Sequence, residues 1–180
     1  MNTRIKKNIL ILGGARSGKS SFAQEVASKS GKRILFCATA EPLDEEMRMR
    51  ILEHKKSRPQ GWDTIEAPKG AGRKIGRLLY KYDAVIIDCI TILVANSMGD
   101  LTKYKEAEKR VDSEIHAIFK CRERKRASII LVSNEVGLGL VPENRVGRAY
   151  RDILGRANQQ LAAQADEVYF MAAGLALKLK

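Results

Sequence analysis

The feature that most constrains the fold of this chain is a glycine-rich segment between a predicted strand and a predicted helix. Residues 13–20 read GGARSGKS and match the pattern G-x-x-x-x-G-K-S. The apolar run Asn8–Leu12 before it indicates a buried strand, and Ser21–Ala27 after it indicates a helix. In a P-loop of this kind, backbone N–H groups and the helix N-terminus bind phosphate. The alternative is a glycine-rich turn that matches by chance, and the flanking strand and helix argue against it.

The loop predicts the contacts of a bound nucleoside triphosphate. All of its residues are expected to surround the phosphates: Gly13, Gly14, Ala15, Arg16, Ser17, Gly18, Lys19 and Ser20. Lys19 can reach the β- and γ-phosphates, which makes it a candidate catalytic residue. The Ser20 hydroxyl can bind the Mg²⁺ that bridges those phosphates. We therefore expect the chain to bind a nucleoside triphosphate together with Mg²⁺.

Strand and helix patterns alternate along the whole chain. Apolar runs of strand length are expected to form strands at 8–12, 32–37, 64–67, 84–88, 127–133, 167–172 and 175–179. Helical patterns lie between them, at 21–27, 43–57, 70–80, 90–97, 104–124 and 145–165. This alternation predicts one α/β domain over residues 1–180, with three layers and a mainly parallel sheet.

Apolar stripes indicate which faces of the helices are buried. In the helix at 104–124 the stripe consists of Ala107, Val111, Ile115, Ile118 and Phe119. In the helix at 145–165 it consists of Val146, Tyr150, Ile153, Leu154, Ala157 and Leu161. The three cysteines are scattered and are expected to be small buried residues rather than disulfide partners or zinc ligands: Cys37, Cys89 and Cys121.

Composition and charge argue against a membrane protein, a secreted protein and a nucleic-acid-binding protein. The apolar runs are too short to span a membrane, and only five strand-like residues lie between the basic residues 1–7 and the P-loop, so we expect a cytoplasmic protein without a signal peptide. The net charge of +12 raises the question of nucleic-acid binding. However, many basic residues lie where a phosphate-handling enzyme would use them: Arg16, Lys19, Lys55, Lys56, Arg58, Arg145, Arg148 and Arg151. No basic stripe with interleaved aromatic residues occurs, so nucleic acid is not an expected partner.

Ligands of parallel α/β sheets bind at the carboxyl ends of the strands, so the residues that follow each strand are candidates. Asp88 follows four apolar residues and is a candidate for the Mg²⁺ site. Ala38, Thr39 and Ala40 follow the second strand and would let a ligand approach the backbone, although an ordinary turn would look the same. The segment 134–145 contains glycines, acids and amides that suit a substrate-binding loop.

His54 is the unusual candidate. It lies near the end of the helix at 43–57, three residues after Ile51 and seven after Met47, so it prolongs an apolar stripe. One interpretation is therefore a half-buried histidine at a helix end. The other is a nucleophile towards phosphorus, with the cations that follow it offsetting the charge that builds on the phosphate. His116, the second histidine, lies in the helix at 104–124 and needs no special explanation.

Together these segments resemble the bifunctional adenosylcobinamide kinase / adenosylcobinamide-phosphate guanylyltransferase family of cobalamin biosynthesis, over nearly the whole chain. The P-loop alone is shared by many proteins. More specific are Arg50–Pro59 around His54 and the loop Asn134–Arg145, and Arg151–Gln159 also agrees.

The resemblance implies a RecA-like fold, a homo-oligomer that is a trimer, and two reactions. The first phosphorylates adenosylcobinamide with ATP or GTP. The second transfers GMP from GTP to that phosphate, through a GMP–histidine intermediate at the residue matching His54, and releases pyrophosphate. By the same matching, nucleotide contacts fall on residues 13–20 and on Ala38, Thr39, Ala40, Lys55, Lys56, Ser57, Arg58, Glu66 and Asp88.

Two positions depart from the family. Glu53 stands where the family often has a second histidine, which bears on how the imidazole is oriented, and Asp88 stands where it often has Glu. Two other functions stay open at this stage. One is a simple P-loop kinase of a small metabolite in which His54 is structural, and the other is a P-loop ATPase that acts on nucleic acid.

Overall fold

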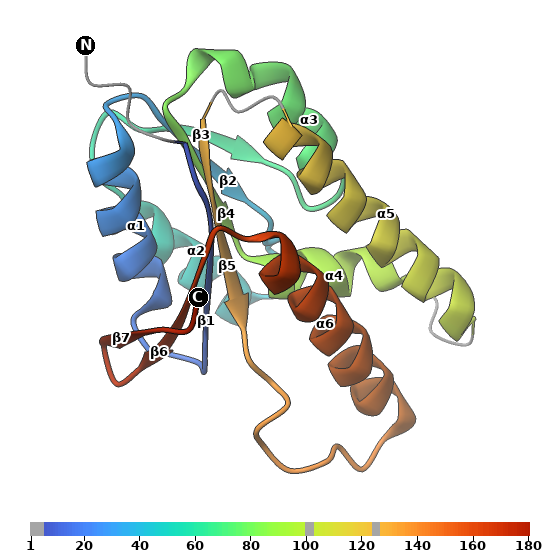
Figure 1. Ribbon diagram of the computed structural model, residues 1–180. Coiled ribbons are helices and arrows are strands. Elements are labelled where there is room, and N and C mark those ends of the chain that lie inside the picture. Colours follow the sequence, from blue (N-terminus) through green and yellow to red (C-terminus); the bar gives the residue numbers. More distant parts are fainter. Residues whose placement is uncertain (1–5, 100–102, 124–126) are drawn as a thin grey trace.

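The computed structural model describes residues 6–99, 103–123 and 127–180, which form a seven-stranded sheet between layers of helices (Figure 1). The strands are β1 (Asn8–Gly13), β2 (Ile34–Ala38), β3 (Asp63–Glu66), β4 (Ala84–Asp88), β5 (Ser128–Asn134), β6 (Glu167–Ala172) and β7 (Leu175–Lys178). The helices are α1 (Lys19–Ser30), α2 (Glu45–Lys56), α3 (Ala71–Leu78), α4 (Ile90–Met98), α5 (Tyr104–Glu123) and α6 (Arg145–Gln164), with a 3₁₀ turn, η1, at Leu79–Lys81. The expected three-layer α/β fold is confirmed.

The sheet order is β3-β2-β4-β5-β1-β6-β7, and every neighbouring pair is parallel except β6 and β7. Strand β5 therefore lies between the P-loop strand β1 and the strand β4 that ends in Asp88. Gly13 pairs with Asn134, and Ala38 pairs with Asp88. The carboxyl ends of β1, β2, β4 and β5 consequently meet at one edge of the sheet.

Helices cover the two faces of the sheet unequally. Helix α1 lies on one face, and α3, α4, α5 and α6 lie on the other (Figure 1). The central strands are apolar throughout, as expected for strands covered on both sides, and β2 is buried along its whole length. In α5 the predicted stripe is buried at Ala107, Val111, Ile115 and Ile118 and partly buried at Phe119. The predicted last residue of this helix, 124, lies outside the described residues.

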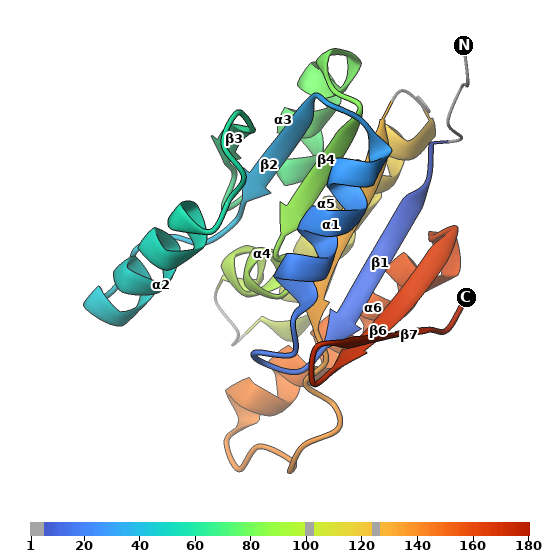
Figure 2. The ribbon, with the colours of Figure 1, turned by 90° about the vertical axis from the view of Figure 1, so that its left-hand side faces the viewer.

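Two predictions about buried faces are wrong. Val146, in the first turn of α6, is exposed, because this end of the helix reaches beyond the sheet that covers Ile153, Leu154, Ala157 and Leu161. Helix α2 buries none of its residues, since it projects from the body beyond the edge of the sheet (Figure 2). Its stripe of Met47 and Ile51 is only partly covered, and His54 is exposed rather than half-buried.

As predicted, Cys37 and Cys121 are buried, and Cys89 is partly buried. Within the described residues, none of the helices combines the length and the apolar character needed to cross a membrane.

Candidate nucleotide site

The P-loop connects β1 to α1 through a sequence of unusual backbone conformations. Gly13 has a φ of 151°, Arg16 a φ of 56° and Gly18, the residue before α1, a φ of 94°. Glycine is required at 13 for a second reason, since a Cβ there would lie 2.4 Å from the carbonyl oxygen of Met171. The backbone thus turns back on itself between strand and helix, which is how consecutive N–H groups come to face a phosphate.

Lys19 lies inside this loop and is only 7% exposed. Its Nζ donates to the carbonyl oxygen of Gly14 at 2.5 Å and lies 3.4 Å from the Ser17 hydroxyl. Burial lowers the pKa of Lys19, whereas Cys89 and Asp88 nearby oppose that change. The ammonium is therefore folded over the loop, with the Gly14 carbonyl oxygen as its partner.

The C-terminal hairpin, formed by β6 and β7, packs against the P-loop through its turn. The amide of Gly174, in the turn between β6 and β7, donates to the carbonyl oxygen of Ser17 at 3.1 Å. A Cβ at Gly18 would lie 3.2 Å from the Cα of the same Gly174. Sequence reasoning missed this support, because nothing in residues 172–175 marks them as neighbours of the P-loop.

Asp88 lies at the end of β4, beside the first residues of α1. The Ser20 hydroxyl lies near its carboxyl group, whose Oδ2 atom is buried without a hydrogen-bond partner in the described part of the chain. Burial raises the pKa of Asp88, and the contact with Ser20 and the charges of His54, Arg58 and Lys19 work against that rise. A buried, unpaired carboxylate oxygen next to a serine hydroxyl is a suitable pair of oxygen ligands for Mg²⁺. The two residues predicted as metal ligands thus lie together and fit that ion.

Arg58 joins the His54 segment to the same place. Its guanidinium lies 3.9 Å from the centre of the Phe36 ring on β2, and Nη1 is 3.4 Å from the Thr64 hydroxyl. The Nε atom is buried and makes no hydrogen bond within the described residues. Burial lowers the pKa of Arg58, and Asp88 and Glu66 oppose this change. The residue is held by stacking and keeps donors free for an anion.

The other predicted residues of this segment are exposed. Lys55 forms an ion pair with Glu66 at 3.0 Å, which connects α2 to the end of β3. The Ser57 hydroxyl donates to the carbonyl oxygen of His54 at 3.1 Å and closes the end of α2. Lys56 is exposed near the same helix end, and His54 is near enough for its charge to affect Asp88. The structure therefore brings His54, Lys55, Arg58 and Glu66 to the side of the sheet edge that holds Asp88.

The Thr39 side chain connects the carboxyl ends of β2 and β4 and is not exposed to solvent. Its hydroxyl donates to the Cys89 carbonyl oxygen at 2.7 Å and accepts from the Cys89 amide at 2.8 Å. Asn96 of α4 donates to the Thr39 carbonyl oxygen at 2.9 Å. The neighbouring Ala38 is buried and Ala40 is partly buried, so this segment lies at the sheet edge with its one polar side chain satisfied internally.

A buried polar network holds the end of β5. The Thr91 hydroxyl accepts from the Asn134 amide at 2.6 Å, and the Ser133 hydroxyl donates to Asn158 Oδ1 at 2.7 Å. Tyr150 donates to the Thr91 carbonyl oxygen at 3.3 Å. These residues fix where the loop after β5 leaves the sheet. The signal that could have found them is the run of polar residues that ends each apolar strand at this edge.

The loop between β5 and α6, residues 135–144, starts against the P-loop. The Glu135 amide donates to the Gly13 carbonyl oxygen at 3.0 Å. Arg148 and Arg151, expected to serve phosphate, instead donate to backbone carbonyls of this loop: Arg148 to Pro142 and Glu143, and Arg151 to Gly139 and Leu140. Arg145 stays exposed and makes no hydrogen bond or ion pair with the described residues. No group of three or more potential metal-binding side chains occurs in the part of the chain that the structure covers.

Comparison with known proteins identifies the family of this chain. The family model described as cobinamide kinase / cobinamide phosphate guanyltransferase matches residues 9–179. The bifunctional adenosylcobalamin biosynthesis protein CobU of Salmonella typhimurium is 41% identical over 180 residues, which cover 96% of this chain and 99% of that protein. CobU of Escherichia coli is 38% identical with the same coverage. The bifunctional adenosylcobalamin biosynthesis protein CobP of Pseudomonas aeruginosa is 38% identical over 171 residues, or 95% of this chain and 96% of that protein.

The match spans the P-loop, the His54 segment and the loop after β5 in one alignment, and the resemblance expected from those segments is confirmed. The chain belongs to the cobinamide kinase / cobinamide phosphate guanyltransferase family and is a bifunctional kinase and guanylyltransferase.

Proposed function

We propose that the chain phosphorylates adenosylcobinamide with ATP or GTP and then transfers GMP from GTP to that phosphate by way of His54. The observation that carries the proposal is the convergence of the His54 segment on the P-loop. His54, Arg58 and Ser20 of the P-loop all lie close enough to Asp88 to influence its pKa. A triphosphate held by Gly13–Ser20 would therefore have the Arg58 guanidinium and the His54 imidazole near the side that faces away from the P-loop.

In the proposed guanylyl transfer, the neutral imidazole of His54 attacks the α-phosphorus of GTP. An N–P bond forms, the bond to the bridging oxygen breaks and pyrophosphate leaves. A phosphate oxygen of adenosylcobinamide phosphate then attacks the same phosphorus, so that a P–O–P linkage forms and the imidazole is released. Lys19 and Arg58 would offset the charge that develops on the phosphate oxygens, and Lys55 adds a further cation.

The exposure of His54 supports this role, because a nucleophile that serves a nucleotide and then a bulky acceptor must be reachable by both. Helix α2 buries no residue, so the His54 imidazole does not pack in the hydrophobic core and stays accessible to ligands.

Ser20 and Asp88 are proposed to hold Mg²⁺, whose charge would stabilise the phosphates. The remaining nucleotide contacts are proposed at the P-loop, at Ala38–Ala40 and at the following residues: Lys55, Lys56, Ser57, Arg58, Glu66 and Asp88. We further propose that residues 1–180 act as one domain, as a homo-oligomer in the cytoplasm, where ATP and GTP are made, and without a nucleic-acid partner.

The experiment separates the two reactions by their products. Purified protein is incubated with adenosylcobinamide, ATP, GTP and Mg²⁺, and the corrinoid products are resolved by mass spectrometry. Wild type should form the GDP derivative, whereas His54→Ala should stop at the phosphate. His116→Ala is the matched control, because that histidine is also exposed but lies on α5, which covers the face of the sheet opposite to α1. A His54→Ala protein that forms the GDP derivative at the wild-type rate would leave a role for His54 at the helix end only.

A further inference from the structure

The loop between β5 and α6 and the first turn of α6 expose four apolar side chains beyond the carboxyl end of β5. Leu138 is 80% exposed, Leu140 97%, Val141 65% and Val146 55%. We call these four residues the apolar ledge. Apolar side chains that gather on a surface mark a binding site more often than scattered ones do. The ledge lies at the carboxyl edge of the sheet, where ligands of parallel sheets bind.

The loop that carries the ledge is braced from inside the protein. Arg151 donates to the carbonyl oxygens of Gly139 and Leu140 at 3.3 and 3.2 Å, and Arg148 donates to the Pro142 carbonyl oxygen at 3.0 Å. The Asn144 side chain accepts from the Gly147 amide at 2.7 Å and begins α6. Because these contacts hold the backbone in place, the leucines are kept in solvent instead of folding back onto the core.

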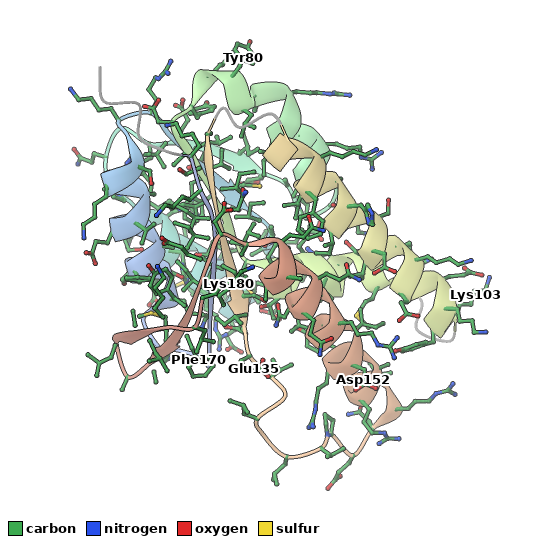
Figure 3. All side chains as sticks on the ribbon, viewed as in Figure 1. Tyr80, Lys103, Glu135, Asp152, Phe170 and Lys180 are labelled. Carbon is green, nitrogen blue, oxygen red and sulfur yellow. The ribbon has the colours of Figure 1, made fainter. Side chains whose placement is uncertain are left out.

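The loop that carries most of the ledge starts at the phosphate site. The Glu135 amide donates to the Gly13 carbonyl oxygen, and Glu135 Oε1 accepts from the Gly137 amide. These two hydrogen bonds fix the start of the loop against the P-loop. Figure 3 shows Glu135 at this end of the molecule, far from Tyr80 at the opposite end of the sheet. An acceptor lying on the ledge could therefore place a hydroxyl at the P-loop phosphates.

We propose that the apolar ledge binds the corrin ring of the acceptor, and that Arg145 binds its phosphate after the first reaction. This proposal rests on the proposed function, which names the acceptor. A corrin is a large ring with methyl groups and broad apolar faces, which suits exposed leucine and valine side chains. The exposed Arg145 has no partner among the described residues, and its charge complements the anionic product of the kinase reaction.

The test measures binding without turnover. Adenosylcobinamide absorbs visible light, so its equilibrium dialysis against the full chain in the absence of nucleotide yields a dissociation constant. The double variant Leu138→Ser/Leu140→Ser should bind about tenfold more weakly or worse, because its apolar contacts are lost. Tyr80→Ser is the matched control, because it also removes an exposed apolar side chain (59% exposed) but lies at the opposite end of the sheet. Arg145→Gln should weaken binding of adenosylcobinamide phosphate and leave that of adenosylcobinamide unchanged.

Equal binding by wild type and the double variant, or no binding by wild type, would overturn the proposal. Sedimentation of both proteins tests the other occupant, a second copy of this chain. If the double substitution lowers the sedimenting mass and leaves corrinoid binding unchanged, the ledge is an interface between copies and the proposal is wrong. Failure of the proposed function would look different, since that protein would bind adenosylcobinamide and not phosphorylate it.

Discussion

The hydroxyl of Thr39 both donates to the carbonyl oxygen and accepts from the amide of Cys89, at 2.7 and 2.8 Å. This pair of hydrogen bonds ties the carboxyl end of β2 to the residue after Asp88, so the position of the candidate Mg²⁺ ligand depends on a side chain from the neighbouring strand. The Thr39 side chain is fully buried, which means that neither bond can be replaced by water.

Thr39→Val should therefore destabilise the protein although it keeps the shape of the side chain. The change leaves the Cys89 amide without its buried partner, and the free energy of unfolding should fall by about 1–3 kcal/mol. Thr39→Ser keeps the hydroxyl and should lie closer to wild type. Urea denaturation of the three proteins checks this prediction, and equal stability of the valine variant and wild type would contradict it.

Gly13 and Gly14 offer a second pair of matched substitutions. An added Cβ at Gly13 would meet the Met171 carbonyl oxygen at 2.4 Å, whereas one at Gly14 meets nothing within 4 Å. Gly13→Ala should lower the free energy of unfolding by about 1–3 kcal/mol or more, because rigid backbone has to move. Gly14→Ala should leave stability nearly unchanged. Thermal unfolding of both variants decides the matter, and a Gly13→Ala protein as stable as wild type would show that the hairpin does not fix the loop.

The fold and much of the site could be predicted because they follow from local pattern. Apolar runs and glycine-rich turns placed most strand ends within one or two residues, as at β4 and β6. Periodicity shows which face of a helix is apolar but not whether another element packs against that face. The apolar stripe of α2 is regular, yet none of its residues is buried. Val146 belongs to the apolar stripe of α6, but the part of the protein that buries this stripe does not reach it.

Long-range relations were also beyond the sequence. Asp88 and His54 are distant in the chain, and only the order of the strands brings α2 near the end of β4. The role of Arg148 and Arg151 in bracing a loop could not be distinguished from phosphate binding, because the same side chain donates to carbonyl and phosphate oxygens alike.

Lys19→Ala tests the P-loop assignment. It removes the ammonium that would face the terminal phosphates, so both the kinase and the guanylyltransferase rates should fall by about a hundredfold or more. Lys29→Ala is the control, because Lys29 lies at the exposed end of the same helix and pairs with Glu25. Steady-state rates of both half-reactions give the answer. Wild-type turnover by the Lys19→Ala protein would remove Gly13–Ser20 from the site.

Asp88→Asn should raise the Mg²⁺ concentration needed for half-maximal rate, since the amide keeps the size of the side chain and loses its charge. Without Mg²⁺ the same variant should gain stability relative to wild type as the pH rises. Burial raises the pKa of Asp88 in the folded state, so wild type loses stability as the pH rises from the ordinary value of 3.8 towards the raised pKa, and asparagine does not ionise. Mg²⁺ titrations and urea denaturation across pH check both parts. An unchanged Mg²⁺ requirement would reduce Asp88 to a structural carboxyl group.

The central claim is that His54 carries GMP, and covalent labelling tests it most directly. Wild-type protein incubated with GTP labelled at the α-phosphate and Mg²⁺, with no corrinoid present, should gain the mass of one GMP. The bond should be labile in acid and stable in base, as expected for a phosphoramidate. His116→Ala should label like wild type and His54→Ala should not label at all. A wild-type protein that gains no GMP, or a His54→Ala protein that is labelled fully, would contradict the account.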